Sequence, residues 1–404
     1  MRVLVVGSGG REHALAWKLS HAGNGIELHA APGNPGIAEL GPCHPVRAED
    51  GEGLLGLARE LGVDLVLIGP EAPLVAGVAD QLRQGGIAVF GPSAGAARIE
   101  GSKSFAKEVM RAAGVPTAET LSVARPPCVI KADGLAAGKG VFVCHTQEEV
   151  EAGVRAAAIL GESFLIEELL QGEELSVFAL VDGDRVLPLA TARDYKRVGD
   201  NDSGPNTGGM GAYSPVSSAP PAEEVIEIVH QPVVEELARR GTPFIGLLYA
   251  GLMLTDDGPR LLEFNCRFGD PETQAILPRL EGDFLGALAA AAQGDLGEIE
   301  VSAGDRAAVT VVLASGSYPE QGDVGTPIDG VSAAEAEGAL VFHAGTAMRD
   351  GRLVTNGGRI LNVTAVGDTP DVARSRAYAA CERISFEGCR YRRDIAIGEV
   401  NVVR

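Results

Sequence analysis

The sequence predicts an α/β protein of three units, the first of which is a doubly wound parallel sheet. Short apolar runs and helical patterns alternate over about the first 95 residues, which is typical of a parallel sheet covered by helices. The length of 404 residues corresponds to about two to four domains. After about residue 300 the pattern changes to short strands with tight turns, which indicates a separate, smaller unit of α and β structure.

In the N-terminal unit we expect strands at 2–6, 63–70 and 86–92, and helices at 11–23 and 73–84. The run at 2–6 is apolar and ends at Gly7, as parallel strands buried on both faces do. Ligands of such folds bind beyond the carboxyl ends of the strands. Three segments lie there: GSGGRE (7–12), APGNPG (31–36) and GPEAP (69–73).

The middle of the chain begins with a helix at 102–113, which Gly114 ends. Strand-like runs follow, then a long Gly/Pro/Asn-rich segment at 194–215, and a loop of this length is usually functional. The remaining predicted strands are 127–134, 139–144, 163–170, 175–183, 185–192, 247–255, 260–266, 307–316, 340–348, 352–358 and 359–367, and the remaining helices are near 221–240 and 370–384.

Composition excludes several classes of protein. The net charge of −21 is unsuitable for binding nucleic acid, whose phosphates require Lys and Arg. The six cysteines are scattered without a C-x-x-C pair, which is typical of reduced thiols in a cytoplasmic protein. Neither a signal-peptide pattern nor an apolar run of about 18 residues is present, so we expect no membrane partner and a cytoplasmic location.

The strongest chemical signal is LLEFNCRFGDPE at 261–272. Alternate residues of a strand share a face, so Glu263 and Asn265 project together while Phe264 points the other way. A carboxylate and an amide oxygen suit a hard cation such as Mg²⁺, which takes its other ligands from water and nucleotide phosphates. The alternative is a strand whose polar residues face solvent. Arg267 follows closely and could bind a carboxylate or a phosphate.

A second signal is KADGLAAGKG at 131–140. Lys131 ends an apolar strand and supplies a compact positive charge for a phosphate oxygen. The loop that follows has few side chains, so its N–H groups can approach anions closely. Its spacing differs from a Walker loop, because Gly140 stands where Ser or Thr would bind Mg²⁺. A solvent-facing lysine followed by a hairpin turn is the alternative.

Two weaker signals complete the set. In FLIEELLQGEE (164–174) an apolar strand ends in acids, which could accept hydrogen bonds from ribose hydroxyls, while the backbone near Glu168 could pair with an adenine edge. GSGGRE begins like a dinucleotide fingerprint, but Glu12 replaces the last glycine. Backbone recognition of phosphate still fits this segment, whereas a nicotinamide enzyme does not.

Together, VLVVGSGGREHALAWKL, GPEAPLVAGV, KADGLAAGKG, GPNTGGMGAYSP and RFGDPETQ resemble the glycinamide ribonucleotide synthetases (phosphoribosylamine–glycine ligases), a family of the ATP-grasp superfamily. The resemblance covers nearly the whole chain in order. It implies an N-terminal α/β domain (1–101), an ATP-grasp domain (102–300, with a small ATP-covering lobe at about 118–190) and a C-terminal domain (301–404). It also implies a ligase of purine biosynthesis that joins glycine to 5-phosphoribosylamine through glycyl phosphate, with ATP and Mg²⁺ or Mn²⁺, as a monomer or weak homo-oligomer. The alternatives are another ATP-grasp carboxylate–amine ligase and a nucleotide-binding protein without turnover.

The family motifs also imply roles for individual residues. Glu263 and Asn265 would bind the metal, and Arg267 and Asp270 would lie near glycine and the acyl phosphate. ATP would be bound by Lys103, Lys131, Gly134, Gly138, Lys139, Gly140, Glu167, Glu168, Leu169 and Glu174, with the glycine-rich loop acting as a lid that excludes water. Phosphoribosylamine would contact Gly9, Gly10, Arg11, Glu71, Asp194, Lys196, Gly208, Gly209, Met210 and Gly211.

The chain departs from the family pattern at three places. Only SVARP lies between Leu121 and Pro127, where relatives have a further strand and helix, so the small lobe should be trimmed. Arg193 stands where glutamine is common. Ala250 occupies the position of a third acidic metal ligand in related ligases, which implies that the protein supplies only two ligands and water completes the shell.

Overall fold

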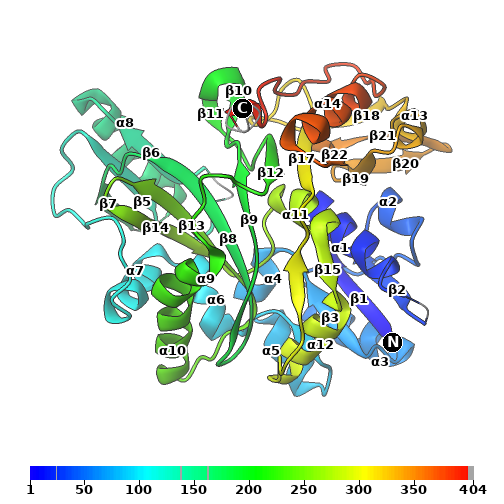
Figure 1. Ribbon diagram of the computed structural model, residues 1–404, viewed down its shortest axis with the longest axis horizontal. Helices are drawn as coiled ribbons and strands as arrows, with labels where there is room; N and C mark the ends of the chain where they lie inside the picture. Colours follow the sequence, from blue (N-terminus) through cyan, green and yellow to red (C-terminus); the bar gives the residue numbers. More distant parts are fainter. Residues whose placement is uncertain (24, 137–138, 162, 399–404) are drawn as a thin grey trace.

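The N-terminal unit is built on a four-stranded parallel sheet in the order β2-β1-β3-β4 (Figure 1). The computed structural model describes residues 1–23, 25–136, 139–161 and 163–398. The sequence did not predict β2, because ELHAAP has one large apolar residue and gains its order from pairing with β1. The strands are β1 (Arg2–Gly7), β2 (Glu27–Pro32), β3 (Leu65–Ile68) and β4 (Val89–Phe90), and the helices are α1 (Gly10–Ser20), α2 (Pro35–Ala38), α3 (Gly51–Leu61), α4 (Glu71–Val75), α5 (Val78–Gln84), α6 (Ala94–Gly101) and α7 (Lys103–Ala112).

A second sheet has eight antiparallel strands in the order β14-β13-β8-β9-β12-β17-β22-β19. It joins the middle of the chain to the C-terminal part, because β12 pairs with β9 on one side and with β17 on the other. The strands are β8 (Glu173–Asp182), β9 (Val186–Asp194), β12 (Gly211–Ser214), β13 (Ile245–Thr255), β14 (Gly258–Asn265), β17 (Ala307–Ala314), β19 (Leu340–His343) and β22 (Arg359–Gly367).

The segment 194–215 is not the unbroken loop that its composition predicts. It contains the end of β9, a short hairpin of β10 (Arg197–Gly199), η1 (Asp200–Asp202) and β11 (Ser203–Asn206), and then β12. Pairing with β9 and β17 stabilises β12 as a strand despite its polar neighbourhood. The turn between β11 and β12 carries Gly208–Met210 and remains irregular.

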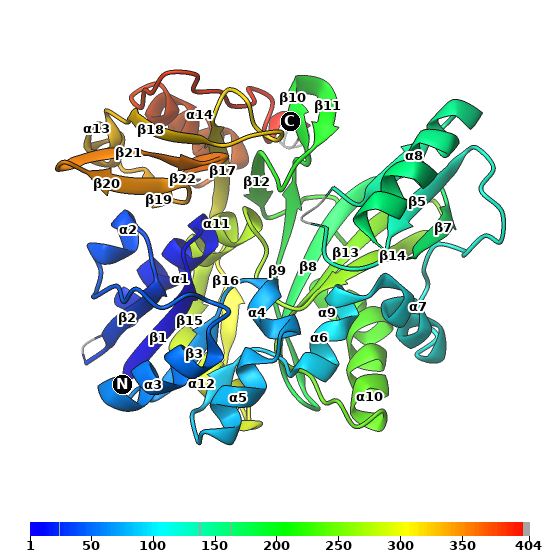
Figure 2. The same ribbon diagram turned by 180° about the vertical axis from the view of Figure 1, so that it is seen from behind.

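The small lobe projects from the rest of the molecule at the edge of both ribbon views (Figures 1 and 2). Its sheet has the order β6-β5-β7, and one helix covers it. A separate core of Cys128, Ile130, Ala132, Cys144, Val150 and Ala157 holds the lobe together. We placed residues to about 190 in this lobe, but β8 and β9 pair within the large sheet. The elements of the lobe are β5 (Cys128–Ala132), β6 (Val141–Cys144), α8 (Gln147–Leu160) and β7 (Phe164–Glu168).

The remaining elements pack around the two larger sheets. A single helical segment near 222–239 includes a π-helical turn, and a three-stranded sheet in the order β18-β21-β20 belongs to the C-terminal unit. Among the described residues, no helix has the length and apolar character needed to cross a membrane. These elements are α9 (Ala222–Val225), η2 (Ile226–His230), α10 (Gln231–Arg239), α11 (Glu272–Ile276), η3 (Leu277–Arg279), β15 (Leu280–Gly282), α12 (Phe284–Gln293), β16 (Val301–Ala303), β18 (Asp323–Pro327), α13 (Val331–Ala336), β20 (Thr346–Arg349), β21 (Arg352–Gly357) and α14 (Pro370–Cys381).

Candidate functional site

Glu263 and Asn265 lie at the end of β14 and share one face of the large sheet. In the register of β13, Glu263 is opposite Gly251 and Asn265 is opposite Tyr249, and residues directly opposite in an antiparallel pair share a face. Phe264 points to the other face and is buried. Both polar side chains are half-buried, and neither forms a side-chain hydrogen bond within the described part of the chain. Two accessible oxygen ligands without protein partners fit a hard divalent cation.

The same sheet face carries a polar network next to this pair, which is buried at Ser176, Tyr249 and Glu272 and half-exposed at Lys196 and Glu174. Ser176, opposite Gly251, lies 2.8 Å from the Tyr249 hydroxyl, which donates to Glu272 Oε1 at 2.8 Å. Lys196 Nζ contacts Asp194 at 2.9 Å and also donates to Glu174. Ala250 belongs to the opposite, buried face, so it cannot contribute a ligand next to Glu263.

Burial and repulsion between carboxylates raise the pKa values of two acids in this network. Burial, followed by the nearby Asp194 carboxylate, raises the pKa of Glu272 to about 7. Burial also raises the pKa of Asp194, although Lys196 opposes the rise. Burial alone would lower the pKa of Lys196, but Asp194 and Glu174 raise it well above its ordinary value. The network therefore has a fixed cation and an acid that changes protonation near neutral pH.

The predicted phosphate ligand Lys131 is held by a buried acid. Its Nζ lies 2.7 Å from Glu167 Oε2 and donates to the Leu262 carbonyl oxygen at 3.0 Å. Glu167 also binds Lys107 Nζ at 2.8 Å, and all three side chains are buried. Glu167 therefore positions two lysines with its carboxylate, which leaves only its backbone for an adenine edge.

Lys103 lies between the glycine-rich loop and Glu263. Its Nζ donates to the Gly134 carbonyl oxygen at 2.9 Å, and its backbone N–H donates to Asp133 Oδ1 at 2.6 Å. Burial lowers the pKa of Lys103, and the neighbouring Glu263 carboxylate opposes this effect. One lysine therefore interacts with both the base of the loop and the Glu263 carboxylate.

The described part of the loop also reaches the C-terminal unit. Lys139 Nζ donates to the Pro319 carbonyl oxygen at 3.1 Å, and Gly140 accepts a hydrogen bond from Ala132 N–H at 2.8 Å. Gly134 has φ +100°, a conformation that glycine adopts readily. Gly138, which we assigned to ATP, lies outside the described residues.

On the adenine side, the Glu168 carboxylate is occupied by its own neighbourhood. It accepts from Glu119 N–H at 2.8 Å and lies 3.6 Å from Arg260. The backbone of Leu121 pairs with that of Ile166 at 2.8 Å, so the shortened segment 121–128 still packs on the lobe. Leu169 directly follows the last residue of β7, and Glu174 is the second residue of β8.

Arg267 sits in a charge cluster that the sequence motif does not reveal. Its guanidinium lies 3.2 Å from Glu71 and 3.0 Å from Glu100. Burial alone would lower the pKa of Arg267, but the two carboxylates raise it. For Glu71, burial favours a higher pKa, but Arg267 and Arg11 lower it to about 2. Arg11 also donates to the Phe268 carbonyl oxygen at 3.1 Å, which ties α1 to the RFGDPE turn.

The predicted glycines pack where larger residues would collide. A Cβ at Gly10 would lie 2.2 Å from Asn362 Nδ2, and one at Gly209 would lie 2.4 Å from Pro271. Gly9 N–H donates to Glu12 Oε2 at 2.6 Å, so the acid that replaces the last fingerprint glycine caps α1. Met210 is fully buried, so its side chain is not accessible to a ligand, and Gly211 begins β12.

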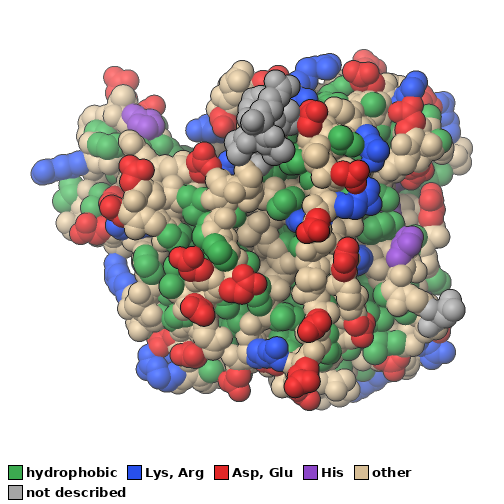
Figure 3. All heavy atoms as spheres, in the orientation of Figure 1, with side chains coloured by type: hydrophobic (Ala, Val, Ile, Leu, Met, Phe, Trp, Pro, Cys, Tyr) green, Lys and Arg blue, Asp and Glu red, His purple; other side chains and the backbone are tan. Residues whose placement is uncertain are grey.

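A cavity of about 490 Å³ lies between the N-terminal and the C-terminal unit. Its wall consists mainly of glycine backbone, five amide or hydroxyl side chains and one arginine. Acidic side chains are spread over the face of the molecule shown in Figure 3. The lining residues are Ser8, Gly9, Pro32, Gly33, Asn34, Asp270, Tyr318, Ala344, Gly345, Thr346, Asn356, Gly357, Gly358 and Arg359.

Gly9, predicted to contact phosphoribosylamine, and Asp270, predicted to lie near glycine and the acyl phosphate, both line this cavity, whereas the sequence motifs indicated none of its lining residues from the C-terminal unit. Asn34 could have been suspected from APGNPG, where it caps α2 and donates to the His343 carbonyl oxygen at 2.8 Å. Tyr318 and Arg359 carry no local signal, since each lies in an ordinary loop or strand of the C-terminal unit. Within the described residues, no group of three or more His, Cys, Asp or Glu side chains is arranged to hold a metal.

Three family models described as phosphoribosylglycinamide synthetase match the chain: the N domain at residues 1–100, the ATP-grasp (A) domain at 101–273 and the C domain at 308–398. Curated phosphoribosylamine–glycine ligases from Streptomyces coelicolor and Agrobacterium fabrum are 52% and 49% identical, each over 98% of this chain and 99% and 98% of their own lengths. The crystal structure of phosphoribosylamine–glycine ligase from Thermotoga maritima has a TM-score of 0.85 and 38% identity, covering 98% of this chain and 100% of its own. An N5-carboxyaminoimidazole ribonucleotide synthetase structure, also from Thermotoga maritima, is 18% identical with a TM-score of 0.63, covers 95% of this chain and 99% of its own, and shows the fold alone.

Proposed function

Since the chain belongs to the phosphoribosylglycinamide synthetase family, we infer that it is an ATP-dependent ligase joining glycine to 5-phosphoribosylamine. The products are glycinamide ribonucleotide, ADP and phosphate, as purine biosynthesis requires. Matches to all three family domains and identity near 50% over full-length relatives support this activity over another ATP-grasp ligase or a protein without turnover.

The chemistry explains why the site is built from cations and backbone donors. A carboxylate is a poor electrophile, because it is an anion and lacks a good leaving group. Transfer of the γ-phosphoryl group of ATP to glycine gives glycyl phosphate, whose carbonyl carbon the amine of phosphoribosylamine attacks, with release of phosphate. Phosphoryl transfer depends on positioning and charge neutralisation more than on a protein nucleophile.

We place ATP between the small lobe and the large sheet. Lys131 and Lys103 would neutralise phosphate oxygens, with Gly134, Lys139 and Gly140 covering them, and Glu174 would accept from the ribose. The backbone of Glu167, Glu168 and Leu169 would border adenine. Glu263 and Asn265 would hold Mg²⁺ or Mn²⁺, which when bound neutralises phosphate charge. The Glu263 carboxylate opposes the effect of burial on the pKa of Lys103, and Lys103 Nζ also donates to the Gly134 carbonyl oxygen at 2.9 Å, which together support a shared triphosphate site.

Glycine and the acyl phosphate would lie near Arg267 and Asp270, beyond the metal pair on the same chain segment. Arg267 is already neutralised by Glu71 and Glu100. It therefore supplies directed N–H donors and holds the turn, rather than adding net positive charge. Asp194 and Lys196, next to Glu174, would border the substrate through the network on the sheet face.

Phosphoribosylamine would occupy the cavity between the N-terminal and C-terminal units. Gly9 and Asp270 line this cavity, while Gly208 donates to the hydroxyl of its wall residue Tyr318 at 2.9 Å. The other residues assigned to this substrate do not line the cavity, so we assign them to its surroundings and not to direct contact: Gly10, Arg11, Glu71, Gly209, Met210 and Gly211. We expect a monomer or weak homo-oligomer located in the cytoplasm.

The test is phosphate release from ATP in the presence of Mg²⁺, glycine and phosphoribosylamine, with each component omitted in turn. We expect release to require all of them and glycinamide ribonucleotide to accumulate in equal amount. Turnover that does not depend on glycine would reject the ligase assignment, and tight ATP binding without turnover would indicate a binding protein. The full domain complement of the family is the observation that carries the assignment.

A further inference from the structure

Arg359, at the start of β22, joins three parts of the site that come from distant segments. Its Nη2 lies 2.8 Å from Asp270 Oδ2, and its Nη1 donates to the Asp270 carbonyl oxygen at 2.7 Å. Nη1 also donates to the carbonyl oxygen of Gly208. One guanidinium from the C-terminal unit therefore fixes both the RFGDPE turn and the turn before β12.

The same side chain forms part of the cavity wall. Its side chain is 20% exposed, and its Nε has no hydrogen-bond partner among the described residues. A planar guanidinium that uses Nη1 and Nη2 on protein oxygens can still direct Nε toward an anion. Gly357, Gly358 and Thr346 line the same wall.

Asp270, the ion-pair partner of Arg359, also lines this cavity. A Cβ at Gly9 would lie 3.7 Å from Asp270 Oδ2, which places that oxygen beside the glycine turn of the N-terminal unit. Its other oxygen accepts from Gln274 Nε2 at 2.7 Å. Burial alone would raise the pKa of Asp270, but Arg359 and then Arg11 lower it, so the carboxylate stays ionised and able to accept from an amine.

We propose that Arg359 is a binding and positioning residue for phosphoribosylamine: it contacts the phosphate of the substrate and orients Asp270 toward the amine that attacks glycyl phosphate. This inference rests on the proposed function. It gives the C-terminal unit a direct part in the second half-reaction. Arg359 contacts Asp270 and the turn at Gly208 but none of the residues assigned to ATP, so we expect the activation of glycine to fall less than the ligation step does.

Arg359→Lys tests the proposal, since lysine keeps the charge but cannot form the same fork to Asp270 and Gly208. Activation of glycine is measured separately with hydroxylamine, whose nitrogen bonds to the carbonyl carbon as the bond to phosphate breaks, giving glycine hydroxamate and phosphate. We expect kcat/KM for phosphoribosylamine to fall at least about 30-fold more than the hydroxamate rate, as for loss of a bidentate contact. Binding of ribose 5-phosphate, measured by calorimetry, should weaken in parallel.

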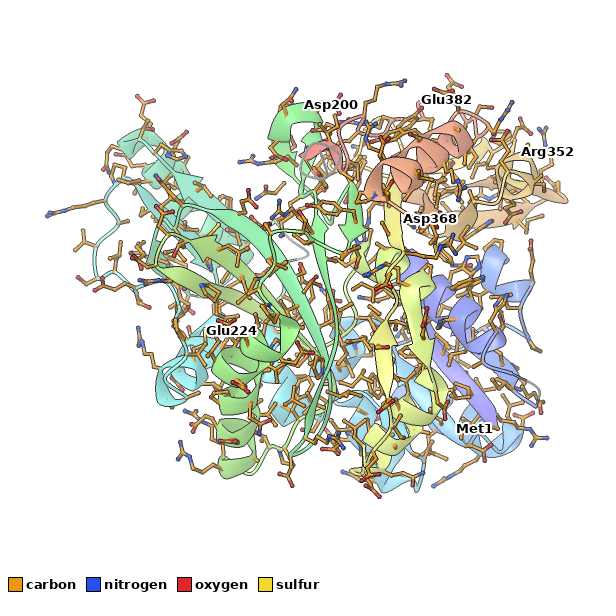
Figure 4. The ribbon with its side chains drawn as sticks, viewed as in Figure 1. Met1, Asp200, Glu224, Arg352, Asp368 and Glu382 are labelled. Atoms are coloured by element: carbon orange, nitrogen blue, oxygen red, sulfur yellow. The ribbon has the colours of Figure 1, made fainter. Side chains whose placement is uncertain are left out.

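Arg352→Lys is the matched control, because Arg352 extends outward from the same unit, away from the cavity (Figure 4). It should leave every rate unchanged. The double variant Arg359→Lys/Asp270→Asn should lose less than the product of the single losses, since the two residues act as one unit. Equal losses of the ligation and hydroxamate rates, or unchanged ribose 5-phosphate binding, would overturn the proposal. A wild-type protein that forms no hydroxamate from ATP and glycine would reject the proposed function itself.

Discussion

Glu272 provides a test of how the polar network on the sheet face affects stability. Its carboxyl is 3% exposed, accepts from the Tyr249 hydroxyl at 2.8 Å and lies near Asp194. Burial, and then Asp194, raises its pKa from 4.5 to about 7 in the folded state, while Lys196 opposes the rise. Folding therefore favours the protonated acid, and Glu272→Gln should imitate that form permanently.

Proton linkage gives the sign and the size of the effect of Glu272 on the free energy of unfolding. The folded pKa lies above the unfolded one, so the stabilisation is fully present below the unfolded pKa and is lost as the pH rises through about 7. Between about pH 5.5 and about pH 8.5, the free energy of unfolding of the wild type should fall by about 2 kcal/mol relative to Glu272→Gln. Contributions from acids that do not interact with Glu272 cancel in this difference.

The assay is urea unfolding of both proteins across that pH range, followed by circular dichroism. Glu173→Gln is the control, because hydrogen bonding to Arg193 lowers the pKa of the exposed Glu173 carboxyl, and its pH dependence should be small and of opposite sign. A difference between wild type and Glu272→Gln that stays constant with pH would refute the assignment of Glu272 as a protonated buried acid.

Three further predictions concern the site. Glu263→Ala should lower glycine-dependent phosphate release about 10²-fold, as for loss of a preorganised electrostatic group, and a near-normal rate at saturating Mg²⁺ would contradict its role. Glu167→Gln should destabilise the protein by about 3 kcal/mol and weaken ATP binding, because Lys131 and a second buried lysine lose their shared carboxylate; thermal unfolding and calorimetry check this, and an unchanged midpoint would be inconsistent with it. Gly10→Ala should cost about 1–3 kcal/mol and raise KM for phosphoribosylamine, because the new Cβ would lie 2.2 Å from the buried Asn362 amide. Wild-type stability and KM in that variant would show that the contact relaxes freely.

The sequence determined the features that depend on the alternation of apolar and polar residues and on the order of strands and helices along the chain. The parallel N-terminal sheet follows from apolar runs that alternate with helices, and the structure confirms this fold class. Glu263 and Asn265 share a face because residues two apart in a strand always do. Specific motifs such as RFGDPE were sufficient to identify the family.

Tertiary structure decided which residues meet across the chain. Glu167 was predicted near adenine, and only the packing of β7 against α7 and β5 shows that two lysines share its carboxylate. The strand β12 was hidden in a polar segment, because its order comes from pairing with β9 and β17. Local composition carries no information about such partners.

The cavity is the clearest example of contacts that the local sequence does not predict. Asp270 and Arg359 are 89 residues apart, and only the docking of the C-terminal unit brings them within 2.8 Å of each other. Periodicity describes how one segment buries its own apolar face, whereas a contact of this kind depends on how separate units pack together. The sequence thus specified the chemistry of the individual segments, and the packing of β17 and β22 into the large sheet decided which of them form one site.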